Sequence, residues 1–442
     1  MHFGIANIIF ILILGGAIFL FARNVGRIRM NIMLGKDVDR SDRKSERWSE
    51  MAGVALGQSK MVRRPIAGFL HVVIYAGFVI INIEVLEILI DGVLGTHRVF
   101  SFLGGFYDFL IESFEILALG VLLSCVFFLT RRYISQIPRF WDKEMKGWPT
   151  KDATIILAAE ILLMLAFLKM NGADYVLQSR GVDPYVQAGA YPVSSWLMAP
   201  ILSNFSDCWL IMVERAAWWF HIVGILAFLN YLVISKHFHI ILAFPNVWYS
   251  NLNAKGRFTN MAEVTKEVKM MMDPNADPFA APAEGAEQPG RFGAKDVTDL
   301  NWVQLMNAYS CTECGRCTSV CPANQTGKEL SPRKIMMDTR DRLEVVGSNI
   351  RANGGESKDD GTSLLDGHIS REELWACTSC NACVDACPIN IDPLSIIVDM
   401  RRYLVMEESA APSELNVMMM NVENNGAPWA FSSADRLNWK DE

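Results

Sequence analysis

Five long apolar stretches dominate the first half of the chain, and polar segments separate them. They cover residues 3–22, 66–90, 109–129, 153–170 and 212–235. Each approaches or exceeds the roughly 20 residues that a helix needs to cross the hydrocarbon core of a membrane. The pattern therefore predicts five transmembrane helices within residues 1–250. The first stretch lacks the basic leader and the small-residue cleavage site of a signal peptide, so we expect it to be retained as an anchor.

The charges of the connecting loops predict the orientation of these helices. Residues 23–64 hold eleven Lys and Arg, and residues 130–152 hold six, whereas the two alternate loops hold almost none. By the positive-inside rule, the N-terminus lies outside and everything after the fifth helix lies inside. The chain has a net charge of −7, and its slight basic excess is confined to the apolar half. This distribution excludes the basic footprint of a nucleic-acid-binding domain.

Three histidines lie in or beside the apolar stretches, where an ionisable side chain indicates function by default. His221 and His239 are 18 residues apart, or five helical turns, so both would project from one face of the fifth helix, ~27 Å apart, with His237 pointing nearly the opposite way. His71 follows Pro65 at a depth nearer to His239. Two facing imidazoles at matching depth can hold a b-type haem, so His71 with His239 is the first predicted pair. The alternative is that these histidines only pack between helices.

Eight of the ten cysteines stand in two copies of the motif C-x2-C-x2-C-x3-C-P, which read CTECGRCTSVCP and CTSCNACVDACP. Three closely spaced thiolates can hold three corners of a four-iron cluster, and in two-cluster ferredoxins the fourth cysteine of each run binds the other cluster. A zinc site needs paired thiolates and does not account for the third cysteine or the proline. Cysteines in such clusters are typical of a reducing compartment. The predicted ligands are Cys311, Cys314, Cys317 and Cys387 for cluster one, and Cys377, Cys380, Cys383 and Cys321 for cluster two.

Helix-start signals accompany the cysteine motifs, so we expect the cluster domain to be mainly helical. They are a short helix at 299–308, Ser331 before Pro332, a capping box from Ser370 to Glu373, and Asp392 before Pro393. Residues 345–368 are rich in Gly, Asp and Ser, which predicts a surface loop.

Composition divides the chain into four parts. Residues 273–293 are rich in Pro, Ala, Gly and acidic residues, which is typical of a linker. The predicted fold class is mainly α, a five-helix transmembrane bundle (N-out, C-in) followed by a cytoplasmic α-helical dicluster ferredoxin domain. The predicted parts are a membrane domain at 1–250, a linker at 251–294, the two-cluster domain at 295–410 and a tail at 411–442.

The motifs and their flanks carry a family resemblance. The segments NWVQLMNAYSCTECGRCTSVCPA and LWACTSCNACVDACPINIDPLSIIVDMRRYL resemble the iron–sulfur part of heterodisulfide-reductase-related membrane oxidoreductases. This group includes the bacterial electron-transfer-flavoprotein:menaquinone oxidoreductases. The membrane half is similar to the cytochrome b subunit of respiratory nitrate reductase, with five helices, His71 in the second, and His221 and His239 at the same 18-residue spacing in the fifth.

Two departures from the resembling families matter. The cytochrome b pattern has a second histidine ten residues after the first, where this chain has Ile81. The number of haems, one or two, therefore stays open. Another group could be the second axial ligand of a haem at His221, or His221 could itself pair with His71. The fused families also continue into cysteine-rich CCG modules, whereas this sequence contains no Cys-Cys pair. The resemblance thus implies that the terminal chemistry lies on a separate cytoplasmic subunit.

The residues and the resemblance together lead us to expect a quinone-linked oxidoreductase subunit in the inner membrane. It would pass electrons between a quinone, for which the resemblance implies menaquinone, haem b, two [4Fe-4S] clusters and a cytoplasmic CCG-type or flavoprotein partner. Two alternatives are a haem-free ferredoxin tethered to the membrane and a cluster-based redox sensor or assembly protein. Six glutamates near the helix ends are either proton carriers for a quinol or solvated interfacial groups: Glu84, Glu87, Glu112, Glu115, Glu160 and Glu214.

Overall fold

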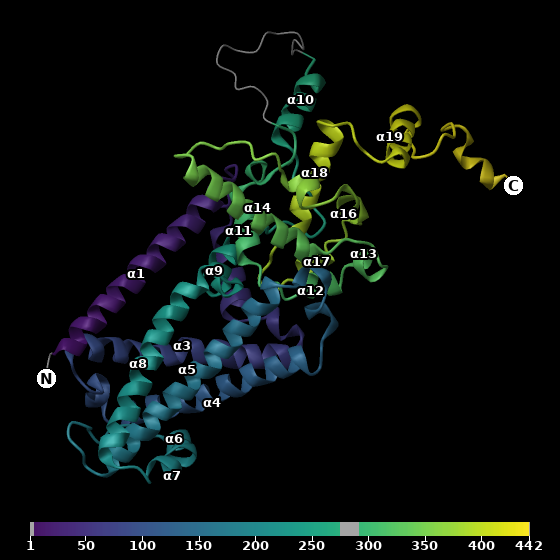
Figure 1. Cartoon of the computed structure of the whole chain (residues 1–442). Coiled ribbons are helices and arrows are strands. Elements are labelled where there is room, and N and C mark those ends of the chain that lie inside the picture. Colours follow the sequence, from purple (N-terminus) through teal and green to yellow (C-terminus); the bar gives the residue numbers. More distant parts are fainter. Residues whose placement is uncertain (1–3, 275–290, 442) are drawn as a thin grey trace.

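The first half of the molecule is a bundle of five long helices (Figure 1). The computed structural model describes residues 4–274 and 291–441, and within these the secondary structure is helical, with isolated bridges but no strand. The five helices are long and apolar enough to cross a membrane, as the sequence predicts. They are α1 (Ile5–Ile32), α3 (Pro65–Leu94), α4 (Gly105–Tyr133), α5 (Trp148–Ser179) and α8 (Asp207–Leu232).

Helices α3, α4, α5 and α8 pack along one another, and α1 lies against α3 and α8. Phe114, Phe167 and Ile222 are buried at their centre. Inside a membrane such side chains leave lipid and not water, so close packing holds these helices together. Most apolar side chains of α1 remain exposed on the bundle surface, as expected for contact with lipid. Short helices α6 (Pro192–Leu197) and α7 (Ala199–Leu202) cover one end of the bundle.

The fifth apolar helix ends before His239, which corrects the prediction that His221 and His239 lie on one helix. Helix α8 ends at Leu232, a 3-10 turn follows at Lys236–Phe238, and α9 begins at His239 and ends at Trp248. Ser235 is extended, and its hydroxyl accepts the His237 N–H at 3.1 Å. His221 and His239 therefore do not share a face of one continuous helix. His237 is also not turned away from His239, because their ring centroids lie 5.3 Å apart.

The second half is a compact helical domain whose main helices are α11 (Trp302–Ser310), α14 (Pro332–Ala352), α16 (Arg371–Ala376) and α18 (Pro393–Met406). The predicted helix starts at Ser331, Ser370 and Asp392 are N-caps. The predicted loop at 345–368 is wrong in its first part, because α14 continues to Ala352 with Val346 buried in the core. Smaller helices are α12 (Arg316–Ser319), α13 (Pro322–Gln325), α15 (Leu364–Gly367) and α17 (Ala382–Ala386).

The two halves share one hydrophobic core at their junction. Ile28 and Ile32, from the last turn of α1, pack in the same buried cluster as Leu305 and Val346 of the second half. Backbone bonds join the halves, with the Lys36 N–H donating to the Leu300 carbonyl at 2.8 Å and the Trp302 N–H to the Lys36 carbonyl at 3.1 Å. The second half is therefore fixed against one end of the bundle.

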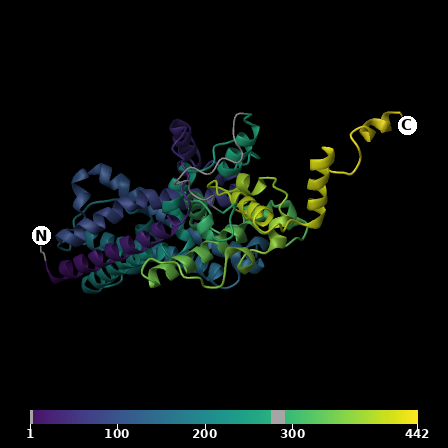
Figure 2. The same cartoon turned by 90° about the horizontal axis from the view of Figure 1, so that it is seen from above.

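The remaining helices lie at the junction, in the linker and in the tail. Helix α2 (Lys44–Glu50) continues into a π-helical turn at Met51–Leu56. Helix α10 (Ala262–Met272) lies in the predicted linker. Most of the Pro-rich part of that linker, residues 273–293, is outside the described residues. Helix α19 (Ser413–Asn425) projects from the body, as the two views agree (Figures 1 and 2). Short 3-10 turns complete the described chain at 61–63, 99–103, 138–140, 143–145, 297–299 and 435–440.

Candidate redox site

The two cysteine motifs have the same local structure. Cys311 follows α11 and Cys377 follows α16, each as the C-cap of its helix. Two residues later the backbone turns left-handed, at Glu313 (φ 55°) and at Ser379 (φ 56°). This turn directs backbone N–H groups toward sulfur: the Ser379 N–H donates to Cys377 Sγ at 3.4 Å. Such N–H groups stabilise a metal-bound thiolate and tune the potential of its cluster.

The fold brings the fourth cysteine of each motif to the other motif. One cavity is lined by Cys387 together with Cys311, Cys314 and Cys317, and also by Cys383. The remaining thiols gather beside it, where Cys321 and Cys377 lie close enough to interact electrostatically and Cys383 interacts with both. Cys387 thus lies with the first motif and Cys321 with the second, while Cys383 lies beside both groups, and the assignment of ligands to each cluster stays a prediction.

These thiols suit a cluster better than a single ion. Burial raises the pKa of the Cys387 thiol to about 11 and that of Cys311 to about 12, so the free thiols are neutral until iron replaces their protons. Across residues 4–274 and 291–441, no group of three or more His, Cys, Asp or Glu side chains converges tightly enough to hold one metal ion. A four-iron cluster binds each thiolate through a different iron, so its ligands stand further apart than those of zinc.

The first cysteine motif faces the bundle. Arg139, from the loop between α4 and α5, donates to the Cys314 carbonyl at 3.0 Å. Arg316 donates to the Lys60 and Met61 carbonyls, both at 3.1 Å, just before α3. The second motif is more open, since Cys380 is exposed. The first motif therefore lies against the loops of the bundle, and the second motif is the more exposed of the two.

His71 and His239 lie close together on the side of the bundle that meets the first motif. Their ring centroids are 6.5 Å apart, with 41° between the ring planes. The His239 Nδ1 atom bonds the Lys236 carbonyl at 3.1 Å, which leaves its Nε2 atom for a metal. Metal-binding histidines are typically anchored in this way through the other ring nitrogen. Burial lowers the pKa of His239 to about 4, which keeps the imidazole in the neutral, metal-binding form.

These residues fit a haem iron. The His71 Nδ1 atom is buried and has no hydrogen-bond partner within the described part of the chain. An orphaned buried nitrogen costs stability unless a ligand satisfies it. Hydrogen bonds to neighbouring helices therefore do not occupy both ring nitrogens of His71 or of His239, as they would in a histidine that serves only for packing.

His221 lies apart from this pair, in the body of α8. Its Nδ1 atom bonds the Leu163 carbonyl at 3.0 Å, and its Nε2 atom is buried with no partner among the residues described. Its ring packs on Phe167 at 5.6 Å between centroids. Like His239, His221 is held by a backbone carbonyl through Nδ1, so it is a second candidate haem ligand. The structure brings His71 close to His239 and not to His221.

Lys236 and Glu313 connect the histidine pair to the first motif, and sequence reasoning missed both. The Lys236 ammonium pairs with Glu313, which lies between Cys311 and Cys314, and donates to the Pro149 carbonyl at 2.7 Å. Glu313 also accepts from Arg340 at 2.8 Å. The one available signal was Lys236 itself, a cation directly after an apolar stretch.

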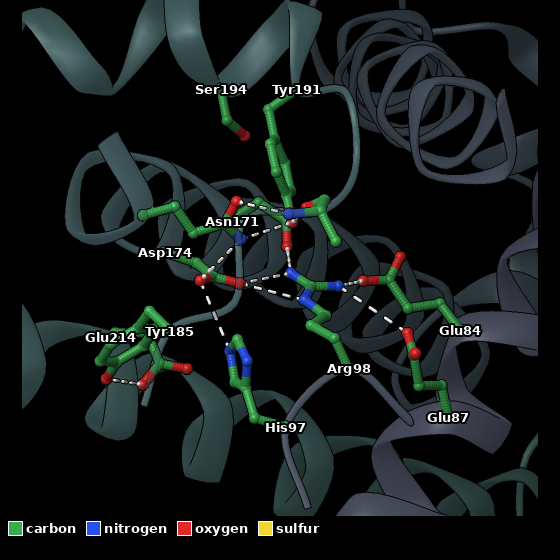
Figure 3. Close-up of polar contacts among 12 residues, drawn as sticks. Glu84, Glu87, His97, Arg98, Asn171, Asp174, Tyr185, Tyr191, Ser194 and Glu214 are labelled. Carbon is green, nitrogen blue, oxygen red and sulfur yellow. Dashed lines mark hydrogen bonds and ion pairs between the residues drawn. The ribbon is translucent and has the colours of Figure 1, made fainter. Parts of the chain in front are cut away.

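A second polar cluster, drawn in Figure 3, surrounds Arg98 just after the C-terminal end of α3, which is the end of that helix remote from the first motif. Arg98, just after α3, is 6% exposed and contacts Glu84 and Asp174. Glu84 and Glu87 were among the predicted carboxylates, whereas Arg98 and Asp174 were missed because they lie just beyond the apolar stretches. A search for charged residues buried at helix ends would have found them.

Comparisons with known proteins agree with the cysteine pattern. The model of the 4Fe-4S dicluster domain matches residues 310–391. The "Probable iron-sulfur-binding oxidoreductase FadF" of Bacillus subtilis (strain 168) is 28% identical over 100% of this chain and 61% of its own length. The "EtfAB:quinone oxidoreductase" of Syntrophomonas wolfei is 26% identical over 92% of this chain and 55% of its own.

A third relative matches a smaller part of the chain. The "Probable membrane-anchored ferredoxin" of Chromohalobacter salexigens is 37% identical over 34% of this chain and 24% of its own length. The chain thus spans less than two thirds of the curated relatives it matches, and no solved structure matches it significantly. The first of these relatives is iron–sulfur-binding by name, and this chain carries a 4Fe-4S dicluster domain after five helices long and apolar enough to cross a membrane.

Proposed function

We propose that the protein is a membrane-bound electron-transfer subunit that connects a quinone pool, menaquinone by resemblance, to a cytoplasmic CCG-type or flavoprotein partner. The observation that carries the proposal is the buried connection between the His71–His239 pair and the first cysteine motif through Lys236 and Glu313. When bound, haem b and the two [4Fe-4S] clusters supply one-electron chemistry. The named relatives, iron–sulfur oxidoreductases and a quinone oxidoreductase, support this redox role.

The side chains at the junction hold the redox groups close together and keep water out. His71 and His239 are the predicted axial ligands of one haem b, and His221 is the candidate for a second. Lys236 fixes His239 with its carbonyl while its ammonium neutralises Glu313 within the cluster-one motif. Buried side chains in a low-dielectric junction reorganise little, which favours rapid electron transfer.

The basic loops support the proposed orientation, with the cluster domain in the cytoplasm and the bundle in the inner membrane. Arg64 donates to Ser319 Oγ at 2.7 Å, and Arg63 pairs with Asp385 at 3.3 Å. Both arginines come from the basic loop at 23–64, so this loop and the cluster domain lie at the same end of the bundle. The positive-inside rule places that end in the cytoplasm.

The exposed side of the second motif is the proposed contact for the soluble partner. Cys380 is exposed, whereas Cys311 and Cys321 are buried. An electron that arrives near the first motif would thus leave the protein through the second. We propose no residues for the quinone site itself.

A reduced-minus-oxidised spectrum of the detergent-purified protein, with haem quantified per polypeptide, tests the proposal. We expect the α band of a b-type haem at one haem per chain, lost in His71→Leu and retained in the control His368→Leu, whose residue lies in the cluster domain. Two haems per chain would make His221 a ligand. A protein with intact clusters but no haem band would instead be a tethered ferredoxin, and the proposal would fail.

A further inference from the structure

The buried polar cluster at the end of the bundle remote from the cysteines is built around one guanidinium (Figure 3). Arg98 Nη1 donates to Glu84 Oε1 at 2.8 Å, and Arg98 Nε donates to Asp174 Oδ2 at 3.0 Å. Arg98 Nη2 donates to Asn171 Oδ1 at 2.7 Å, and a Glu87 oxygen lies 3.9 Å from Nη1. We call Glu84, Glu87, Arg98 and Asp174 the Arg98 network. Its three carboxyl groups are each at most 2% exposed.

The charges of this network do not balance if every carboxyl group is ionised. Three carboxylates would face one guanidinium, and His97, 3.5 Å from Asp174, can add at most one positive charge. An unpaired charge in such a place is costly, and like charges that share a site cannot all ionise. At least one carboxyl group of the network therefore carries a proton when His97 is neutral.

The hydrogen bonds indicate which group holds that proton. Glu87 accepts from the Phe100 N–H and the Tyr107 hydroxyl, both at 2.8 Å, and both contacts favour the carboxylate. Asp174 accepts from Arg98 and also from Gln178 at 3.1 Å.

Glu84 is the least stabilised anion of the three. It accepts from Arg98 through one oxygen, while its other oxygen is buried and finds no partner in the described residues. A carboxylate with a bare, buried oxygen is disfavoured, so the proton belongs on Glu84.

Neighbouring ionisable groups are already engaged and leave this assignment unchanged. Glu115, from α4, accepts from the Val193 and Ser194 N–H groups at 2.9 and 3.0 Å. Glu214, from α8, pairs with Arg215 and accepts from the Tyr185 hydroxyl. Tyr191 donates to the Ala188 carbonyl at 3.0 Å.

A chain of contacts leads from Glu84 to the edge of the protein. Asp174 and Glu84 share Arg98, and His97 contacts Asp174 with its Nε2 atom. The His97 side chain is 16% exposed, but its Nδ1 atom is buried and has no hydrogen-bond partner in residues 4–274 and 291–441. An imidazole with a free nitrogen at the edge of a carboxylate cluster can accept a proton on one atom and release it from the other.

We propose that the Arg98 network is a proton-binding site that exchanges protons with the quinone at this end of the bundle. When the quinone gains two electrons and becomes quinol, two O–H bonds form. The O–H bond of Glu84 breaks to supply one proton and leaves a carboxylate beside Arg98, and an O–H bond of water breaks to supply the other and leaves hydroxide, which takes a proton from the solvent. Glu84 then regains its proton from water. Oxidation of the quinol reverses each step. The quinone part of this inference rests on the proposed function, whereas the proton on Glu84 does not.

Infrared spectroscopy of the purified protein, with haem and clusters loaded, tests the resting state. We expect a protonated carboxyl band that shifts in heavy water, is lost in Glu84→Gln and is retained in Glu112→Gln. Glu112 is the matched control because it lies on α4 of the same bundle but is exposed. Absence of this band from the wild-type protein overturns the proposal, and that measurement needs no variant.

A second experiment adds a menaquinone analogue to dithionite-reduced protein, freed of excess dithionite, and follows haem oxidation and the infrared band together. We expect the Glu84 band to be lost as quinol forms, and haem oxidation by the quinone to slow by about 100-fold in Glu84→Gln, since positioned proton transfer typically contributes 10²–10⁴-fold. Reduction of the haem by dithionite should be unaffected. An unchanged band during quinone reduction overturns the proton exchange but leaves the proposed function standing. Failure of the quinone to oxidise the wild-type haem overturns the proposed function and, with it, the exchange.

Discussion

At the scale of single residues, Lys236 serves two parts of the molecule at once. Its carbonyl positions the His239 ring, and its ammonium pairs with Glu313 inside the first cysteine motif. Its side chain is 9% exposed, so little water screens this charge. A buried cation stabilises any neighbouring group that has gained an electron.

We therefore predict that Lys236→Met lowers the midpoint potentials of both the haem and cluster one. Glu313→Gln should raise the potential of cluster one, because it removes an anion and leaves two cations. For one charge about 10 Å away at an effective dielectric of about 20, each shift is on the order of tens of millivolts. Optical and electron paramagnetic resonance redox titrations measure the two potentials.

Lys236→Arg is the matched control, because it keeps the charge and should leave both potentials close to the wild-type values. Shifts of the same sign in Lys236→Met and Glu313→Gln would indicate distortion of the sites rather than an effect of charge, and would contradict this role of Lys236.

At the scale of elements, the contact between α1 and α14 fixes the cluster domain to the bundle. Asn31, in the last turn of α1, is buried and bonds the Tyr309 hydroxyl at 2.8 Å and Arg351 at 2.6 Å. It lies directly on Gly347 of α14, where an added Cβ atom would meet Asn31 Oδ1 at 2.1 Å. Only a glycine allows the two helices to approach this closely.

We predict that Gly347→Ala destabilises this contact by about 1–3 kcal/mol, the usual effect of overpacking. The expected result is a lower thermal unfolding temperature in detergent and faster proteolysis between the two halves. Gly26→Ala, on α1, is the control, since an added Cβ atom there meets nothing within 4 Å. Equal stability of the two variants would show that the α1–α14 contact is not rigid.

The elements also show why sequence reasoning succeeded in some places and failed in others. Signals that reside in neighbouring residues were reliable: the five apolar stretches, the N-caps and the spacing of the cysteines. The break after α8 was missed because Asp152, on α5, accepts from the Ser235 hydroxyl at 2.7 Å and the Lys236 N–H at 3.1 Å. A partner 83 residues away ends that helix, and the local apolar pattern carries no trace of it.

The same distinction applies to the candidate site. That His71 and His239 lie close together was expected from their matching depth, whereas the five-turn relation between His221 and His239 was wrong because they do not lie on one helix. Their role as haem ligands stays a prediction. The partners Lys236, Glu313 and Arg98 depend on which elements meet in space, and residue types alone do not reveal that. Resemblance supplied the quinone, which no residue pattern indicated.

At the scale of the whole molecule, the redox residues and the Arg98 network lie at opposite ends of the bundle. Arg139, Arg316 and Lys60 meet around the first motif at one end, while Arg98 and Glu84 lie at the other. Glu84 follows His71 by thirteen residues on α3, which corresponds to about 20 Å along the helix. Proton exchange at the far end combined with electron exit at the cluster end would move charge across the membrane.

This arrangement requires the two ends to face opposite sides of the membrane, and Cys208 provides a direct test. Cys208 is exposed in the first turn of α8, at the end remote from the cluster domain. We predict that a membrane-impermeant maleimide labels the protein in intact spheroplasts and that Cys208→Ser abolishes this labelling, because Cys125 is buried. A cysteine placed by Asn251→Cys, an exposed position after α9, should react only after the membrane is opened. The reverse pattern would put the clusters outside the cell and exclude a cytoplasmic electron partner.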